Sequence, residues 1–191
     1  MNHYYLFFFI SLLASSSVLA QTAPETRVEK KQFTYHMLAG ISAEMGVART
    51  STVRVSGPVE LGFVWQATSS SSDLYAYLRP VVNGEFRYYY NLDKRYAQGK
   101  RVVNNSANFI GPIISLYGPA IVKSENISVV DFASVFGAVW GIQRNYGQRF
   151  NFQLSLGPGI GITEEETSFT PVGQLSFGFR IGKYTFDTFG M

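Results

Sequence analysis

His36 is one of two histidines in the chain and the only one that follows the N-terminal apolar stretch. Ser42 and Glu44 lie at the same parity, so in one strand the three side chains would share a face. A base beside a hydroxyl and a carboxylate is the arrangement of a serine hydrolase. However, six residues of continuous strand span roughly 20 Å, so Ser42 is not expected to reach His36. A nucleophile would have to come from a neighbouring strand, and we predict no catalytic residue.

A basic connector follows the aromatic run at 88–90. Its cations are Lys94, Arg95, Lys100 and Arg101, and with Asp93 they give the connector a charge of +3, which equals the formal net charge of the whole chain. Such a cluster can contact the phosphates of lipid head groups or lipopolysaccharide. The alternative is a solvated loop without a ligand.

Neither a metal nor a cofactor is predicted. A metal site needs several convergent ligands, and the chain has no cysteine and few histidines. The glycines of GPGIGI alternate on one strand face, and they do not form the turn before a helix that binds a dinucleotide. We therefore expect no cofactor and no nucleic acid partner.

The polar residues lie in segments where apolar and polar residues alternate with a period of two, which is typical of β-strands. At 149–162 the sequence RFNFQLSLGPGIGI separates phenylalanine, leucine and isoleucine from asparagine, glutamine, serine and glycine. We expect strands at 33–47, 53–65, 74–90, 107–118, 128–145, 149–162 and 172–182.

These runs number seven, whereas single-chain outer-membrane barrels have an even number of strands, so we expect about eight. The missing strand could come from a division of 74–90 at Asn83-Gly84, from 119–127 or from the tail YTFDTFGM. Asn83-Gly84 is a strong hairpin signal. A hairpin there would put arginines on both faces, so we favour one long strand.

The two faces of these strands indicate which side meets water. The polar face carries mostly small residues and isolated charges, whereas the apolar face carries rings and branched chains too bulky for the interior of eight strands. Apolar residues outside and polar residues inside are the pattern of a membrane barrel. We predict an all-β fold, an antiparallel up-and-down transmembrane β-barrel of about eight strands. The alternative is a secreted barrel or sandwich.

Charged residues on the polar face would then share a narrow interior and must pair, because an unpartnered buried ion is costly. Glu44, Arg54 and Glu60 are expected to be the closest set, since a short turn joins the runs that carry them. The predicted interior ionic network is Glu44, Arg54, Glu60, Arg87 and Arg180.

The first twenty residues predict export. An apolar run followed by small residues up to Ala20 is typical of a secretory signal peptide at 1–20. A membrane-anchoring helix is the alternative. Residues 21–191 are then a single outer-membrane barrel domain.

Charged residues make up 15% of the chain, against about 25% in an average soluble protein.

The stretch EFRYYYNLDKRYAQGKRVVNNSANFIG, from Glu85 to Gly111, resembles a segment of uncharacterised small outer-membrane β-barrel proteins of Gram-negative bacteria. The plan of the chain is also similar to the eight-stranded barrels of OmpA and OmpX type. The resemblance implies a location in the outer membrane, contact with membrane lipid and delivery by the outer-membrane assembly machinery. It transfers no catalytic residue. The chain departs from the usual pattern at its end, where TFGM replaces a terminal aromatic residue.

The sequence as a whole predicts an integral outer-membrane barrel with a structural or interaction role. Two alternatives stay open. One is a lipid-modifying barrel enzyme that uses His36, and the other is a secreted lipocalin-like carrier of an apolar ligand.

Overall fold

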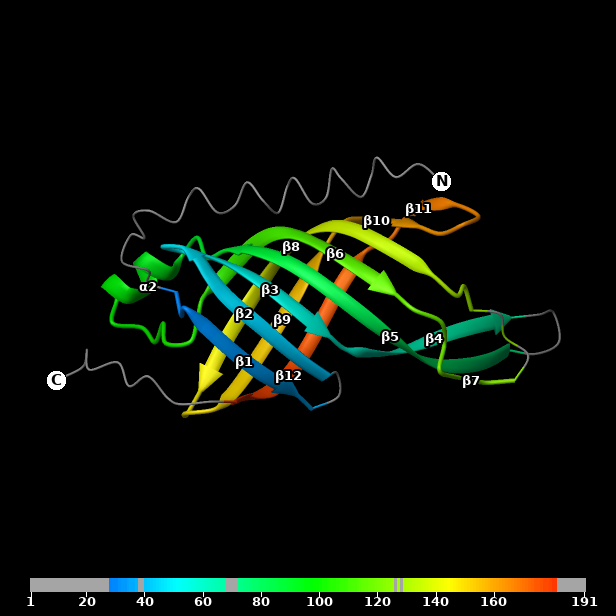
Figure 1. Cartoon of the computed structure of the whole chain (residues 1–191), viewed down its shortest axis with the longest axis horizontal. Helices are drawn as coiled ribbons and strands as arrows, with labels where there is room; N and C mark the ends of the chain where they lie inside the picture. The colour runs from blue at the N-terminus through cyan, green and yellow to red at the C-terminus, as the bar shows by residue number, and fades with distance from the viewer. Residues whose placement is uncertain (1–27, 38–39, 68–71, 126, 128, 182–191) are drawn as a thin grey trace, which may run out of the picture.

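The computed structural model describes residues 28–37, 40–67, 72–125, 127 and 129–181. The predicted signal peptide at 1–20 and the C-terminal tail YTFDTFGM lie outside these residues. Strands make up most of the described chain, and one short helix lies among them (Figure 1). The elements are β1 (Lys31–His36), β2 (Gly40–Ala48), β3 (Ser51–Gly57), β4 (Val59–Ala67), β5 (Ser72–Tyr88), α2 (Leu92–Ala97), β6 (Asn108–Tyr117), β7 (Val122–Lys123), β8 (Ala133–Tyr146), β9 (Phe150–Gly157), β10 (Gly159–Ile162), β11 (Thr167–Phe169) and β12 (Val172–Ile181).

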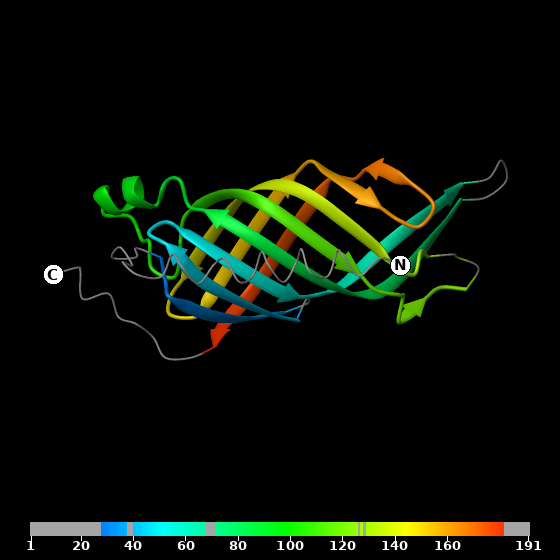
Figure 2. The same cartoon turned by 45° about the horizontal axis from the view of Figure 1, so that its top comes forward.

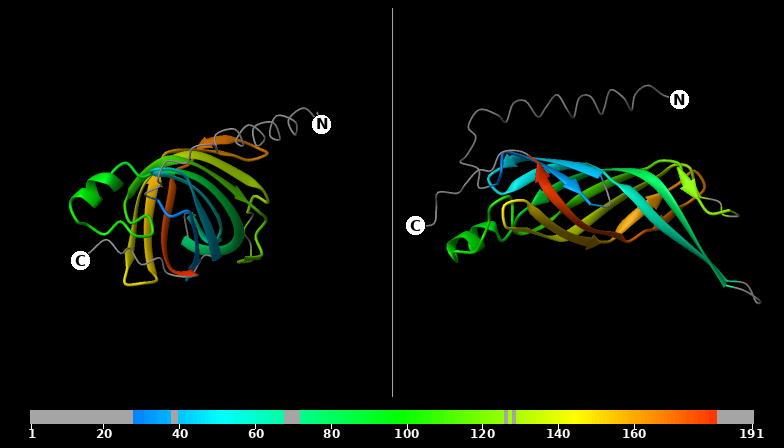
Figure 3. Two further views of the ribbon diagram at one scale, coloured as in Figure 1. Left: turned by 60° about the vertical axis from the view of Figure 1, so that its left-hand side comes forward. Right: turned by 90° about the horizontal axis from the view of Figure 1, so that it is seen from below.

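Eight strands form a ring in the order β1, β2, β3, β5, β6, β8, β9 and β12, and β12 pairs back with β1. Each neighbouring pair is antiparallel. Figure 3 shows these strands tilted around a common axis. The predicted all-β, antiparallel fold is confirmed, and the ring has the expected number of strands.

The two ends of the ring differ. At one end, which we call the plugged end, lie the turns at 49–50 and 147–149 and the connector that holds α2. At the other end, which we call the hairpin end, β4 pairs with the long strand β5, β7 adds to β5, and β10 pairs with β11. Figure 2 shows these hairpins extending beyond the ring.

The predicted strand at 33–47 is wrong, because it is two strands. β1 and β2 form a hairpin in which His36 lies opposite Gly40, so the turn contains three residues. After a turn of three residues, the even-numbered residues of both strands still share one face. The alternation of period two therefore continues through the turn, and the sequence does not show that the chain reverses. Gly40 supports the turn with a positive φ of 90°, a conformation open to glycine.

This hairpin supplies the eighth strand of the ring. Asn83-Gly84 lies inside the unbroken strand β5, as we favoured. The segment at 119–127 contributes only the short strand β7, which pairs with β5 outside the ring. Of the tail YTFDTFGM nothing is described.

Two further predicted strands are divided at prolines. The run at 53–65 becomes β3 and β4 on either side of Pro58, and the run at 149–162 becomes β9 and β10 on either side of Pro158. Proline has no N–H to donate to a ladder, so it ends or redirects a strand. Pro58 marks the point where the chain leaves the ring and enters the β4–β5 hairpin.

The alternation predicts the faces of the ring strands correctly. Their polar side chains fill the interior, and their large apolar side chains lie on the outer surface. Buried polar residues of the ring are Gln32, Thr34, His36, Ser42, Glu44, Ser51, Thr52, Arg54, Ser56, Asn83, Glu85, Arg87, Ser115, Gln143, Asn145, Asn151, Gln153, Ser155 and Ser176. Exposed apolar residues of the ring include Phe33, Tyr35, Ile41, Met45, Val53, Val55, Val82, Phe86, Ile110, Leu116, Phe136, Trp140, Leu156, Leu175, Phe177, Phe179 and Ile181.

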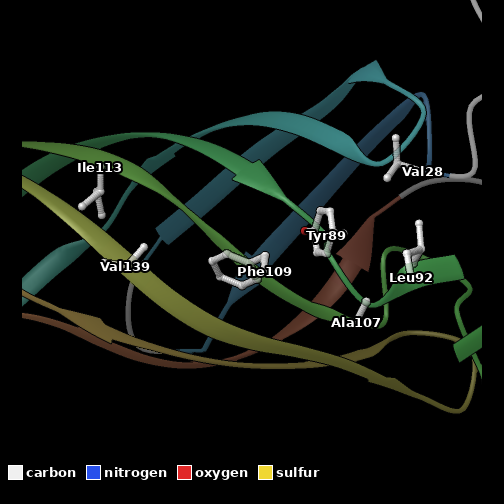
Figure 4. Packing of buried hydrophobic residues seen from close by; sticks show 7 residues of the cluster. All are labelled: Val28, Tyr89, Leu92, Ala107, Phe109, Ile113 and Val139. Atoms are coloured by element: carbon white, nitrogen blue, oxygen red, sulfur yellow. The ribbon is translucent and has the colours of Figure 1, made fainter. Parts of the chain in front are cut away.

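A small apolar cluster extends from the plugged end into the ring. It consists of Val28, Tyr89, Leu92, Ala107, Phe109, Ile113 and Val139 (Figure 4). The segment at 102–107, which we call the plug, turns into the ring and buries Asn104, Asn105 and Ser106 as well as Ala107. The ring is therefore closed by its own connector at this end.

The register can be tested at Gly157, where an added Cβ would overlap the carbonyl oxygen of Ala138 on β8. At Gly173, on the neighbouring strand β12, an added Cβ would meet nothing within 4 Å. We expect Gly157→Ala to lower the free energy of unfolding by about 1–3 kcal/mol through overpacking. Gly173→Ala should change it by less than about 0.5 kcal/mol. Urea titration of the refolded protein measures both, and equal effects would contradict the pairing of β8 with β9.

Candidate functional site

The interior of the ring holds a buried ionic cluster built on Glu85. Arg54 Nη1 donates to Glu85 Oε1 at 2.6 Å. Arg87 donates from Nη2 and Nε to Glu85 Oε2 at 2.6 and 2.7 Å. All three side chains are almost completely buried. One carboxylate therefore joins the guanidinium groups of two strands, β3 and β5.

Glu44 is the second carboxylate of this cluster. Its Oε1 accepts hydrogen bonds from the Thr52 hydroxyl, the Tyr89 hydroxyl and the Asn105 amide, each at 2.8 Å. Its Oε2 lies 3.8 Å from Arg87 Nη1. With two arginines and two glutamates, the cluster has no net formal charge. This pairing lowers the free-energy cost of burying the four charges in an interior that water cannot hydrate freely.

Arg87 also connects the cluster to the plug. Its Nη1 donates to Gln143 Oε1 at 2.8 Å, and its guanidinium carbon lies 4.2 Å from the centre of the Phe109 ring. Gln143 Nε2 and Asn145 Nδ2 donate to the carbonyl oxygen of Asn104 at 3.0 and 2.8 Å. The plug is thus hydrogen-bonded to the wall of the ring.

The plug turns inward because of its two asparagines. Asn104 and Asn105 both have a φ of 61°, a left-handed conformation that asparagine adopts more readily than most residues. The Asn105 side chain donates to Glu44 and accepts from the backbone N–H of Glu29 at 2.8 Å. The Asn-Asn pair in VVNNSAN is the sequence signal for this turn, and neither residue belongs to the predicted site.

The predicted network is only partly assembled. The structure brings Glu44, Arg54 and Arg87 together, and it adds Glu85, which the predicted set lacked. The expected set of Glu44, Arg54 and Glu60 is wrong. Arg54 lies in register with both Glu44 and Glu85, and its hydrogen bond to a carboxylate goes to Glu85.

Glu60 and Arg180 lie apart from the cluster. Glu60 is on β4, beyond Pro58, and pairs with Arg79 at 3.3 Å. Arg180 is on β12 opposite Thr34, and its Nε has no hydrogen-bond partner among the residues that the structure describes. Glu60 is therefore outside the cluster because its run leaves the ring at Pro58, whereas Arg180 stays on the ring strand β12 but makes no side-chain hydrogen bond or ion pair with the cluster in the described part of the chain.

His36 and Ser42 are in contact, so the expectation that they cannot meet is wrong. His36 Nε2 lies 2.8 Å from Ser42 Oγ, because the β1–β2 hairpin folds the two residues onto neighbouring strands. Arg54 Nη2 lies 3.2 Å from the same nitrogen. Since a guanidinium can only donate, His36 Nε2 is an acceptor here.

This arrangement lacks the features of a serine hydrolase. His36 and Ser42 are both almost completely buried, so a substrate would have no path to the hydroxyl. His36 Nδ1, which a triad carboxylate would orient, has no hydrogen-bond partner in the described part of the chain. The Glu44 carboxylate is instead bonded to Thr52, Tyr89 and Asn105. These contacts indicate a structural role for His36.

The basic connector uses two of its four cations to hold its own shape. Arg95 donates to the backbone carbonyl oxygens of Ser106 and Arg101 at 2.9 and 3.0 Å. Arg101 donates to the carbonyl oxygen of Gly147 in the neighbouring turn. Lys94 and Lys100 are exposed. Of the four cations, Lys94 and Lys100 are thus the two whose charged groups are not used in these backbone contacts.

A second candidate site opens at the hairpin end, where a cavity of about 630 Å³ lies between the β4–β5 hairpin and β10–β12. Arg79 is its main cation. The Arg79 guanidinium carbon lies 4.1 Å from the ring centre of Tyr117 and 5.3 Å from that of Tyr77. Asn83 and Ser115 belong to the lining, and the next inward residue of β5 is Glu85 of the ionic cluster. The cavity is therefore a cup that ends at the cluster.

Comparison with known proteins identifies no relative: no family model, no curated protein and no solved structure matches the chain. None of the helices in the described residues has the length and apolar character needed to cross a membrane. Within the same residues, no group of three or more histidine, aspartate or glutamate side chains could hold a metal ion.

Removal of the central carboxylate tests the ionic cluster. Glu85→Gln leaves two buried guanidinium groups with less compensation, and we expect it to lower the free energy of unfolding by about 3–5 kcal/mol. Glu165→Gln, in the exposed turn between β10 and β11, should change it by less than about 0.5 kcal/mol. The double variant Arg54→Gln, Glu85→Gln should recover part of the loss, because it removes one of the uncompensated charges. Urea titration that found Glu85→Gln as mild as Glu165→Gln would contradict a buried carboxylate.

Proposed function

We propose that the chain is an integral outer-membrane β-barrel protein with a structural or interaction role. The supporting observation is the outer surface of the ring, where large apolar side chains point outward on every strand. Soluble proteins rarely expose a contiguous apolar surface larger than a few hundred Å². Apolar residues outside and polar residues inside a closed ring of eight antiparallel strands match the pattern of a membrane barrel.

The interior argues against the two alternatives. A lipocalin-like carrier needs an apolar lumen for its ligand, whereas this lumen holds arginine, glutamate, glutamine and asparagine. A lipid-modifying enzyme based on His36 needs an accessible nucleophile, and Ser42 is buried beside His36. The ionic cluster and the plug also block the lumen between the cup and the plugged end, which supports a role other than that of a general pore.

Apart from the connector at 89–107, the lengths of the loops support one orientation in the membrane. Outer-membrane barrels have short turns on the periplasmic side and longer loops outside the cell. In our proposal the hairpin end, with the β4–β5 and β10–β11 hairpins, faces the exterior, and the plugged end faces the periplasm. An interaction role would then use the protruding hairpins.

This orientation bears on the basic connector. The connector lies at the plugged end, so Lys94, Arg95, Lys100 and Arg101 would meet the periplasmic leaflet. Phosphates of phospholipid head groups are then their closest anionic partners. Lipopolysaccharide, in the outer leaflet, would lie beside the hairpin end instead. Delivery to the membrane would follow export by the predicted signal peptide and use the outer-membrane assembly machinery.

Fractionation of Gram-negative cells that express the full chain tests the proposal. We expect the protein in the outer-membrane fraction, resistant to extraction with alkaline carbonate because its apolar surface contacts acyl chains. Recovery of the folded protein from the periplasm or the medium would contradict it.

A charge on the outer face gives a second test. Leu175→Arg places a guanidinium where the side chain is 61% exposed on the outer wall, and near the midplane we expect a loss of about 2–4 kcal/mol in folding from bilayers. Ser176→Ala, on the inner face of the same strand, should cost less than about 1 kcal/mol. On a water-exposed surface Leu175→Arg would be nearly neutral, and that result would overturn the assignment of the outer face.

A further inference from the structure

A hydrogen-bonded patch lies on the outer wall of the ring toward the plugged end. It consists of Tyr90, Asn108, Trp140 and Arg144, and we call it the arginine patch. Trp140 and Arg144 lie on β8, Asn108 is the first residue of β6, and Tyr90 follows β5. Tyr90 is 44% exposed and Trp140 39% exposed, whereas Asn108 and Arg144 are part-buried. The patch is therefore open to the surroundings of the wall.

The hydrogen bonds of the patch have only one consistent direction. The Arg144 guanidinium can only donate, so Asn108 Oδ1 accepts from Arg144 Nη2 at 2.6 Å. Asn108 Nδ2 then donates to the Tyr90 hydroxyl oxygen at 3.3 Å. The indole N–H of Trp140 also only donates, and it reaches the same oxygen at 2.9 Å. The Tyr90 oxygen therefore accepts twice, and its own proton is left to donate.

The patch thus offers hydrogen-bond donors to a ligand. Arg144 donates one N–H to Asn108 and another to the backbone oxygen of Gln143 at 2.8 Å. A guanidinium has further N–H groups, and these remain for a ligand together with the Tyr90 hydroxyl. The side-chain oxygens of Asn108 and Tyr90 are already in use as acceptors. A set of donors that includes a cation selects an anion.

The positive charge of Arg144 has no carboxylate partner in the described part of the chain. Both of its hydrogen bonds go to neutral oxygens. The formal charge that acts on it is that of another cation, Arg95 of α2. Arg95 also donates only to neutral oxygens, those of the Ser106 and Arg101 backbone. Because a part-buried cation without a counter-ion is costly, an anion bound beside Arg144 would stabilise both guanidinium groups.

The patch lies at the depth expected for lipid head groups. Arg144 is close to the end of β8 at Tyr146, and Tyr90 lies beyond the end of β5. Aromatic residues form girdles where a barrel meets the two interfaces of a bilayer. An arginine on the outer wall costs little at that depth and much more at the midplane. In the orientation proposed above, this end lies in the periplasmic leaflet, which contains phospholipids.

We propose that the arginine patch binds an anionic phospholipid of the phosphatidylglycerol type in the periplasmic leaflet. The phosphate accepts hydrogen bonds from the Arg144 guanidinium and the Tyr90 hydroxyl, and the acyl chains lie along the outer wall beside Ile110, which is exposed. The patch has no carboxylate for an ammonium group, and the charge of Arg95 repels one. This inference rests on the proposed function, because the outer wall must face lipid.

Native mass spectrometry of the full chain, released from detergent micelles that carry one defined lipid, tests this inference. We expect phosphatidylglycerol to bind about fivefold more tightly than phosphatidylethanolamine with the same acyl chains, because only phosphatidylglycerol has a net negative charge. Arg144→Gln should weaken phosphatidylglycerol by about tenfold and reduce the preference for it. Arg144→Lys keeps the charge and should retain the preference. Tyr90→Phe should weaken both lipids by about fivefold, since both have a phosphate.

Matched controls use residues that lie outside the patch at the same end of the ring. Lys31→Gln removes an exposed cation from β1, and screening by salt should limit its effect on either affinity to less than about twofold. Tyr88→Phe removes the hydroxyl of a tyrosine that is 44% exposed, and it should leave both affinities unchanged. Circular dichroism shows that each variant is folded, and flotation with liposomes measures its insertion separately.

Equal binding of phosphatidylglycerol and phosphatidylethanolamine by the folded wild type would overturn the inference. An Arg144→Gln variant that binds phosphatidylglycerol as tightly as Lys31→Gln does would overturn it as well. If either result is found for a protein that inserts into liposomes, the inference fails and the proposed membrane location stands. If the folded wild type does not insert, the proposed function itself fails.

Discussion

The narrow polar interior of the ring is the constraint on which the rest of the structure depends. Eight strands leave an interior that only side chains can fill, so each buried polar group must find its partner across the lumen. Glu85 meets this requirement by accepting hydrogen bonds from Arg54 and Arg87. Glu44 meets it by accepting hydrogen bonds from Thr52, Tyr89 and Asn105. Because the interior is occupied in this way, the large apolar side chains of the same strands have only the outer surface available.

The interior cluster also explains why the two ends differ. At the plugged end, Gln143 and Asn145 bind the carbonyl oxygen of Asn104, and the connector becomes part of the interior. At the hairpin end no such segment turns inward among the described residues, and β4, β7 and β10–β11 extend the wall instead. The result is a cup that is closed toward the plugged end by the ionic cluster. It is open at the hairpin end, where a ligand or partner can approach.

The sequence predicts the faces of the strands well and their ends poorly. Period-two alternation reports which residues share a face, so Leu175 and Phe177 were separated correctly from Gln174 and Ser176. The same alternation continues through a three-residue turn, which is why β1 and β2 read as one strand. The sequence also does not predict which of the buried charged side chains pair with one another. Arg54 faces carboxylates on both neighbouring strands, and only the three-dimensional positions of the side chains decide that it binds Glu85.

The central claim is that the outer side chains of the ring contact acyl chains, and site-directed spin labelling tests it most directly. The chain contains no cysteine, so single cysteines at Gln174, Leu175, Ser176 and Phe177 can each carry a nitroxide in liposomes. We expect the labels at Leu175 and Phe177 to collide often with dissolved oxygen and rarely with a water-soluble nickel chelate. Labels at Gln174 and Ser176 should be shielded from oxygen. Free collision of the Leu175 and Phe177 labels with the nickel chelate would contradict the claim.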